Sequence, residues 1–81
     1  MISTDDVRRL LQAEGKDAVL VVIEGRTEVI GGGQLESEQY RGALEVVTRD
    51  DLVARVGAQP SDRELEEQAS TLDAEVSQLG G

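Results

Sequence analysis

The chain has 81 residues, of which 17 are acidic and 8 are basic, so its formal net charge at pH 7 is −9. This length fits one small domain, residues 1–81. The charge disfavours binding to nucleic acid, because phosphate backbones are neutralised by Lys and Arg. The chain contains no cysteine and no histidine, which excludes disulfides, thiolate chemistry and the commonest metal ligand. The sequence therefore predicts an acidic domain that uses no metal and no cofactor.

The first predicted element is a helix over residues 3–14. Ser3 or Thr4 can cap its first turn with a hydroxyl oxygen. Apolar side chains recur at helical spacing and give it one buried face, formed by Val7, Leu10 and Leu11. Gly15 stands where a glycine commonly ends a helix.

A β-hairpin is predicted next. Residues 18–23, "AVLVVI", are continuously apolar, which is typical of a strand covered on both faces or central in a sheet. Glu24-Gly25 is a plausible turn, and alternating polar and apolar residues follow it as in a half-exposed returning strand. Gly31–Gly33 then breaks the strand. No lysine and no helix start of a phosphate-binding loop follow these glycines, so we expect a flexible turn.

The second half of the chain is predicted to contain a strand and two helices. Residues 31–43 resemble a loop with one helical turn near residues 36–40. "ALEVVT", residues 43–48, predicts a third strand, and Thr48 is a suitable N-cap for a short helix that ends at Gly57. Ser61 and Glu64 have the spacing of a capping box, which starts a last helix over about 62–79.

These elements predict an α+β fold in the order α-β-β-β-α-α. A small antiparallel sheet of two or three strands would have helices before and after it in the chain. An amphipathic helix usually packs its apolar face on such a sheet.

The last helix carries an apolar stripe with the spacing of a heptad seam. Its members are Leu65, Ala69, Leu72, Val76 and Leu79. Three uses compete: packing on the sheet of the same chain, pairing with a second copy in a homodimer, and docking on another protein. Self-pairing would bring acidic flanks together, so a basic partner is electrostatically easier. Tyr40, the single aromatic residue, could border the core or anchor an interface.

The chain ends in Gly80 and Gly81. Glycine after a helix is the usual C-terminal cap, because it adopts the left-handed conformation without steric cost. The alternative is a carrier or modifier tail activated at its carboxylate. Ubiquitin-like and sulfur-carrier proteins are similar to this chain in these last two residues, but their Gly-Gly follows a strand of a β-grasp fold rather than a helix.

The sequence offers little for catalysis. Two acidic pairs, at residues 5–6 and 50–51, each stand in the first turn of a predicted helix, where negative charge is favoured without a metal. No serine has a histidine to activate it. The longest apolar run is too short to cross a bilayer. We therefore expect a non-catalytic, cytoplasmic, bacterial interaction module, such as an acidic neutraliser of a basic protein in the way that antitoxins act.

Overall fold

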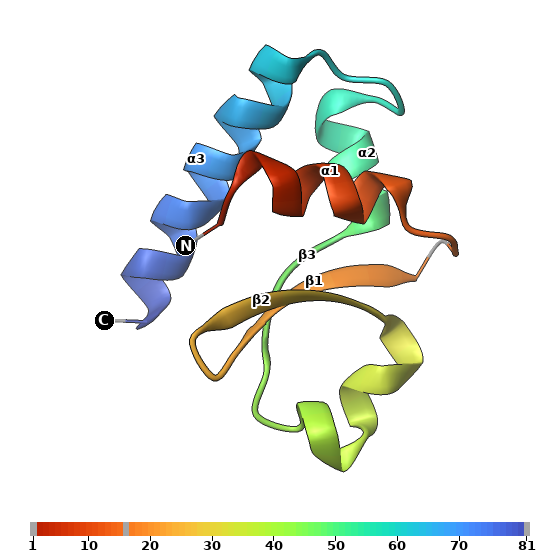
Figure 1. Ribbon diagram of the computed structural model, residues 1–81, viewed down its shortest axis with the longest axis vertical. Coiled ribbons are helices and arrows are strands. Elements are labelled where there is room, and N and C mark those ends of the chain that lie inside the picture. Colours follow the sequence, from red (N-terminus) through yellow and green to blue (C-terminus); the bar gives the residue numbers. More distant parts are fainter. Residues whose placement is uncertain (1, 16, 81) are drawn as a thin grey trace.

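The computed structural model describes residues 2–15 and 17–80, with side chains as far as Gln78. The fold is α+β, as predicted, and its sheet has three strands (Figure 1). In chain order the elements are α1 (Thr4–Gln12), β1 (Ala18–Ile23), β2 (Arg26–Gly31), the 3₁₀ helices η1 (Gly32–Glu36) and η2 (Glu38–Tyr40), β3 (Leu44–Thr48), α2 (Arg49–Val56) and α3 (Asp62–Gly80).

The sheet is antiparallel with the strand order β2-β1-β3, so β1 lies in the centre. β1 and β2 form the predicted hairpin, with Ile23 opposite Arg26. Glu24 and Gly25 make the two-residue turn with positive φ angles of 51° and 78°. Positive φ at both positions matches the twist of the strands. On the other side of β1, the register with β3 shifts at Leu20/Val21, which marks a β-bulge.

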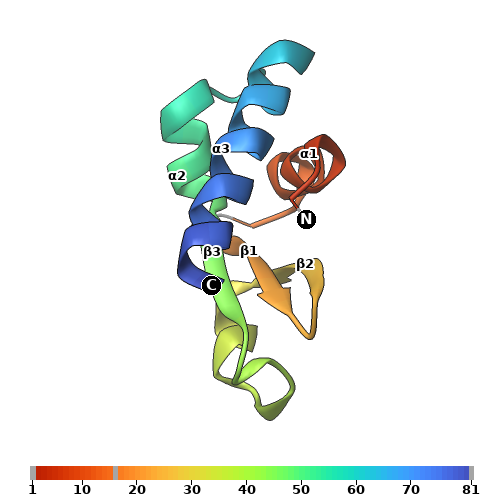
Figure 2. The same cartoon turned by 90° about the vertical axis from the view of Figure 1, so that its left-hand side faces the viewer.

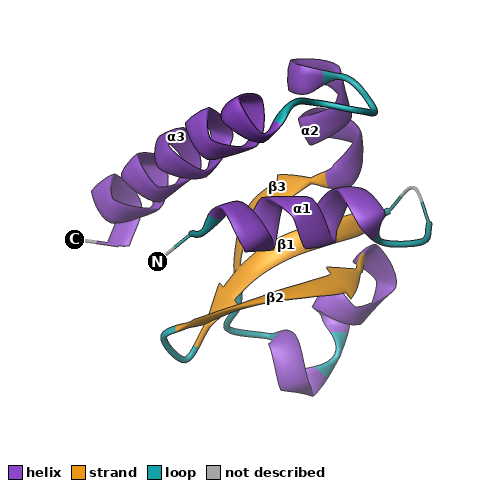
Figure 3. Cartoon of the chain, turned by 45° about the horizontal axis from the view of Figure 1, so that its top comes forward, coloured by secondary structure: helices purple, strands orange, loops and turns teal. Residues whose placement is uncertain are grey.

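The molecule has three layers. In Figures 1 and 3, α1, α2 and α3 cover one face of the sheet and the two 3₁₀ helices lie against the other. Alternate side chains of β1 enter a core on each side of the sheet, so the strand is buried on both faces. This explains why its sequence is continuously apolar rather than alternating.

The main core lies between the sheet and the helices. Its buried members are Ile2, Val7, Leu10, Ala18, Leu20, Val47, Leu52, Leu65, Ala69, Leu72 and Val76. All are aliphatic, and each of the larger ones contributes about 1.5–3 kcal/mol when fully buried. The second core, beneath the sheet, is smaller and contains Val19, Val21, Ile30 and Tyr40.

The predicted helix starts are confirmed at Ser3, Thr48 and Ser61. Ser3 Oγ accepts the Asp6 N–H at 3.2 Å, Thr48 Oγ1 accepts the Asp51 N–H at 3.1 Å, and Ser61 Oγ accepts the Glu64 N–H at 3.3 Å. Gly57 ends α2 with φ of 82°, also as predicted.

The predicted glycine cap of α1 is wrong. The helix ends at Gln12, and its C-cap is Ala13 in an extended conformation. Gly15 has a positive φ of 95°, but it belongs to the connection to β1. The chain needs this extended exit because β1 begins only a few residues later and runs beneath the helix.

The segment from Gly31 to Ala43 is more regular than predicted. β2 includes Gly31, and the two 3₁₀ helices follow in place of one helical turn. The Gln34 side chain accepts the Gly31 N–H at 2.9 Å, and Ser37 Oγ donates to the Gln34 carbonyl at 2.7 Å. At Gly32, a Cβ would approach the Asp17 carbonyl oxygen to 3.1 Å, so this glycine allows close packing against the start of β1.

Candidate functional site

Four residues of the predicted interaction stripe lie in the core of the same chain. Leu65, Ala69, Leu72 and Val76 are at most 7% exposed and pack with α1 and the sheet. Of the three uses considered, packing within the chain is therefore the one that the structure contains. An interface formed by these four side chains would require α3 to leave the core. The side chain of Leu79 lies outside the described residues.

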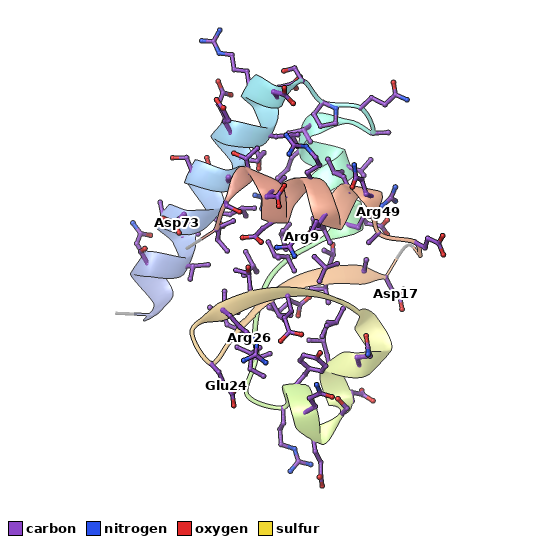
Figure 4. The ribbon with its side chains drawn as sticks, viewed as in Figure 1. Arg9, Asp17, Glu24, Arg26, Arg49 and Asp73 are labelled. Carbon is purple, nitrogen blue, oxygen red and sulfur yellow. The ribbon has the colours of Figure 1, made fainter. Side chains whose placement is uncertain are left out.

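Tyr40 takes part in an internal network rather than presenting its ring to solvent. Its ring is 7% exposed, and its hydroxyl donates to Glu28 Oε1 at 2.9 Å. Arg26 donates to Glu28 Oε2 at 2.9 Å and to Glu24 at 3.1 Å. Figure 4 shows Arg26 and Glu24 together at the hairpin. The hydrogen bond to Glu28 raises the pKa of Tyr40, and partial burial and the Glu28 charge raise it further.

Asp6 is the buried carboxylate of the described chain, with 3% of its surface exposed. It accepts the Ser3 N–H at 3.0 Å and contacts Arg9, which lies on the side of α1 toward the sheet (Figure 4). Burial by itself raises the pKa of Asp6, but hydrogen bonds from Ser3, Thr27 and Arg9 outweigh it and lower the pKa below its ordinary value. Asp6 therefore has the predicted place in the first turn of α1 and also interacts with Thr27 of β2.

The surface carries many acidic groups that form no ion pair. In the described part of the chain, ten carboxylates form no ion pair: Glu14, Asp17, Glu36, Glu38, Glu45, Asp50, Asp51, Glu64, Glu66 and Glu75. Among the described arginines, Arg41, Arg49 and Arg55 form no ion pair, and Arg49 donates to the Leu11 carbonyl at 3.1 Å. The excess of negative charge is therefore left for solvent or a partner.

Gln68 is the one described residue with a buried polar side-chain atom that lacks a hydrogen bond. Its Oε1 is inaccessible to solvent and has no donor within reach. A buried acceptor without a partner costs about 1–3 kcal/mol. Gln68 lies on α3 beside the apolar stripe, and nothing in its sequence context predicts this burial.

The described residues form no pocket and no cluster of acidic side chains suited to hold a metal ion. No helix in the described ranges combines the length and apolar character needed to cross a bilayer. At the C-terminus, α3 extends to Gly80, one residue beyond the predicted end. Gly81, the second member of the alternative carrier tail, lies outside the described residues.

Comparisons with protein-family models, with curated proteins and with solved structures find no match for this chain. The surface itself must therefore carry any functional argument. The contacts missed from the sequence, Asp6 with Thr27 and Tyr40 with Glu28, join residues distant in the chain. Pairing of this kind depends on sheet register and leaves no mark in local spacing.

Proposed function

We propose that the chain is a non-catalytic, cytoplasmic interaction module that binds a basic protein. The observation that carries the proposal is the set of ten carboxylates without ion pairs in the described part of the chain, against three arginines without ion pairs. Such a field attracts a positively charged surface and speeds the encounter with it.

A foreign partner is favoured over a second copy. The apolar stripe that would have formed a homodimer seam is already buried within the chain. A net charge of −9 also makes two copies repel each other at low ionic strength. A basic protein faces neither obstacle.

The experiment is cross-linking in the cells that produce the protein, followed by calorimetric titration of the purified partner. We expect a basic partner whose dissociation constant increases with NaCl concentration, since screening weakens the attraction. Variants Glu66→Gln and Glu75→Gln remove one charge each without touching the core. A partner whose affinity changes neither with NaCl concentration nor in these variants would contradict the proposal. Turnover of a small molecule by the purified protein would also contradict it.

The carrier alternative is separated by deleting Gly80 and Gly81. Because α3 remains helical as far as Gly80, the described chain has no extended tail, and we expect the deletion to leave partner binding unchanged. A conjugate formed through the terminal carboxylate and lost in the deletion variant would support the carrier function instead.

A further inference from the structure

The outer edge of β3 is bordered by no other strand among the described residues. β3 ends the sheet, with β1 on its inner side. In Figure 2 its lower half, toward Leu44, runs below α3 and has no helix or strand on the side away from β1. An edge strand offers unpaired backbone N–H and C=O groups to any extended chain that adds to the sheet.

The register predicts which backbone groups point outward. A two-residue hairpin closes on a hydrogen-bonded pair, here Ile23 and Arg26, and such pairs alternate along antiparallel strands. Val21 and Glu28 then form the next such pair, so Val21 directs its backbone toward β2. Glu45 lies opposite Val21 on β3. The backbone of Glu45 is therefore expected to face the open edge.

The two edges of the sheet differ in charge. On β2, Arg26 pairs with both Glu24 and Glu28. On β3, Glu45 is exposed and forms no ion pair, and Asp50 and Asp51 follow the strand after Arg49, which donates to the Leu11 carbonyl. The β3 edge therefore has the larger uncompensated negative charge.

α3 adds acidic groups over the other face of the sheet. Glu45 lies opposite Val21, whose side chain is in the core beneath the sheet, so the Glu45 side chain lies on the face of the 3₁₀ helices. Asp62 and Asp73 turn toward α1, as their contacts with Arg8 and the Ile2 N–H show. At about 100° per residue, Glu64 and Glu75 lie some 200° around the helix from these two aspartates. That is the flank directed away from α1, on a helix that also contacts β3. Arg41, three residues before β3, is the exposed basic side chain nearest to the strand in sequence.

We propose that the basic partner docks by adding an extended segment to the outer edge of β3 as a fourth strand. This rests on the proposed function and specifies its mode. Backbone hydrogen bonds along β3 hold the segment. Because side chains of a strand alternate between the two faces of a sheet, its Lys or Arg side chains meet Glu45 on the face of the 3₁₀ helices and Glu64 and Glu75 on the face of α3. A second copy of this chain would instead bring two such acidic edges together.

The test is NMR titration of the ¹⁵N-labelled protein with the peptide Lys-Lys-Val-Lys-Lys-Val, blocked at both ends, which presents Lys on both faces of an added strand. We expect chemical-shift changes at residues 44–48 and slower hydrogen exchange of the Glu45 amide. The matched peptide Glu-Glu-Val-Glu-Glu-Val should leave the spectrum unchanged. Shift changes confined to β2 or to the exposed face of α3 would overturn strand addition while leaving a basic-partner function in place.

Variants separate the backbone contribution from the charge contribution. Glu45→Pro removes an N–H that faces outward, a position where an edge strand tolerates proline, and should weaken the Lys peptide roughly tenfold or more. Glu45→Gln keeps the N–H and should weaken it less. Glu75→Gln should weaken it more than the matched Glu66→Gln, because Glu66 lies on the opposite flank. Equal binding by wild type and Glu45→Pro would overturn the proposal.

A charge exchange keeps the test decisive if Glu45→Pro fails to fold. Glu45→Lys should bind the Lys peptide less tightly than wild type does, and the Glu peptide more tightly. No change in either preference would overturn docking at β3. Concentration-dependent shifts at residues 44–48 without peptide would also overturn it, by showing that a second copy occupies the edge. If the cross-linked native partner binds elsewhere, docking at β3 fails and the proposed function stands.

Discussion

Asp6 links three parts of the chain through one carboxylate. It closes the capping box with Ser3, contacts Arg9 and accepts a hydrogen bond from Thr27 on β2. We predict that Asp6→Asn lowers the free energy of unfolding at pH 7 by about 1–2 kcal/mol, as loss of a cap and a charged hydrogen bond does. Urea denaturation measures it, with exposed Asp5→Asn as the control.

The pH dependence of this difference has a definite sign. The folded-state pKa of Asp6 is lower than the ordinary value of 3.8, so folding favours the carboxylate form. Its contribution is present above the unfolded pKa and is lost as the pH falls through the folded pKa. The gap between wild type and Asp6→Asn should therefore shrink below pH 3.8. A gap that stays constant down to pH 2 would contradict this.

Tyr40 gives a second titration with its own optical signal, because the chain contains no other tyrosine and no tryptophan. The Glu28 hydrogen bond raises its folded-state pKa, so its stabilising contribution is full below the unfolded pKa and is lost as the pH rises through the folded value. We predict a phenolate absorbance midpoint above that of free tyrosine. Glu28→Gln should move the midpoint down, whereas Glu38→Gln should not.

Gln68 is the residue at which a substitution should stabilise the fold. Replacing it with Met removes the buried acceptor that lacks a donor and keeps a side chain of similar length. We predict a gain of about 1 kcal/mol in the free energy of unfolding, measured by urea denaturation. Gln78→Met, at an exposed position of the same helix, is the control. A loss of stability would contradict this prediction.

For single residues, the sequence predicts the helix caps but not the side-chain contacts between residues that are distant in the chain. Ser3, Thr48 and Ser61 are recognisable because a cap and its partner lie three residues apart. The partners of Asp6 and Tyr40 are 21 and 12 positions away, by subtraction of their residue numbers. A single sequence contains no distance information for such pairs.

α3 is the element whose packing decides stability. Leu72 has no exposed surface and lies between α3, α1 and the sheet. We predict that Leu72→Ala costs about 2–5 kcal/mol, while Thr71→Ala, on the exposed side of the same turn, changes stability by less than about 0.5 kcal/mol. Thermal and urea denaturation measure both. A Leu72→Ala variant as stable as wild type would show that the stripe is not a core element.

Strand β1 and the 3₁₀ pair show what periodicity can predict about elements. The unbroken apolar run of β1 anticipates a strand covered on both faces, and the structure confirms it. The two 3₁₀ helices could not be predicted, since they are short and have no repeating apolar face. The prediction that Gly15 caps α1 was wrong because a glycine can also mark a change of direction beyond the helix end. Here Gly15 has its positive φ two residues after the C-cap, Ala13.

The whole molecule carries its charge without much internal compensation. Carboxylates distributed over every layer repel one another, which lowers the stability of the folded state. We predict that the thermal midpoint rises as NaCl increases from low concentration to a few tenths molar, as screening shortens the range of this repulsion. Differential scanning calorimetry measures it. A midpoint that falls over this range would indicate that the ion pairs of Arg8 and Arg26 dominate.

The overall architecture follows from the sequence because each helix and strand has a pattern of its own. The location of the acidic edge does not, because the order β2-β1-β3 is a property of the assembled sheet. Glu45 and Glu75 are thirty residues apart by subtraction, and only the packing of α3 over β3 relates them.

The contact between α1 and α3 also bears on how the chain acquires its fold. The first helix packs on the last, and the Ile2 N–H bonds to Asp73 across a separation of 71 residues. Chains that must bring distant segments together fold more slowly than helical bundles of equal length. During synthesis, α1 can meet the sheet and α2 before α3 has been made, but its packing on α3 must wait until the chain extends to Val76. The nascent protein therefore passes most of its translation time without the α3 side of the main core, to which Leu65, Ala69, Leu72 and Val76 belong.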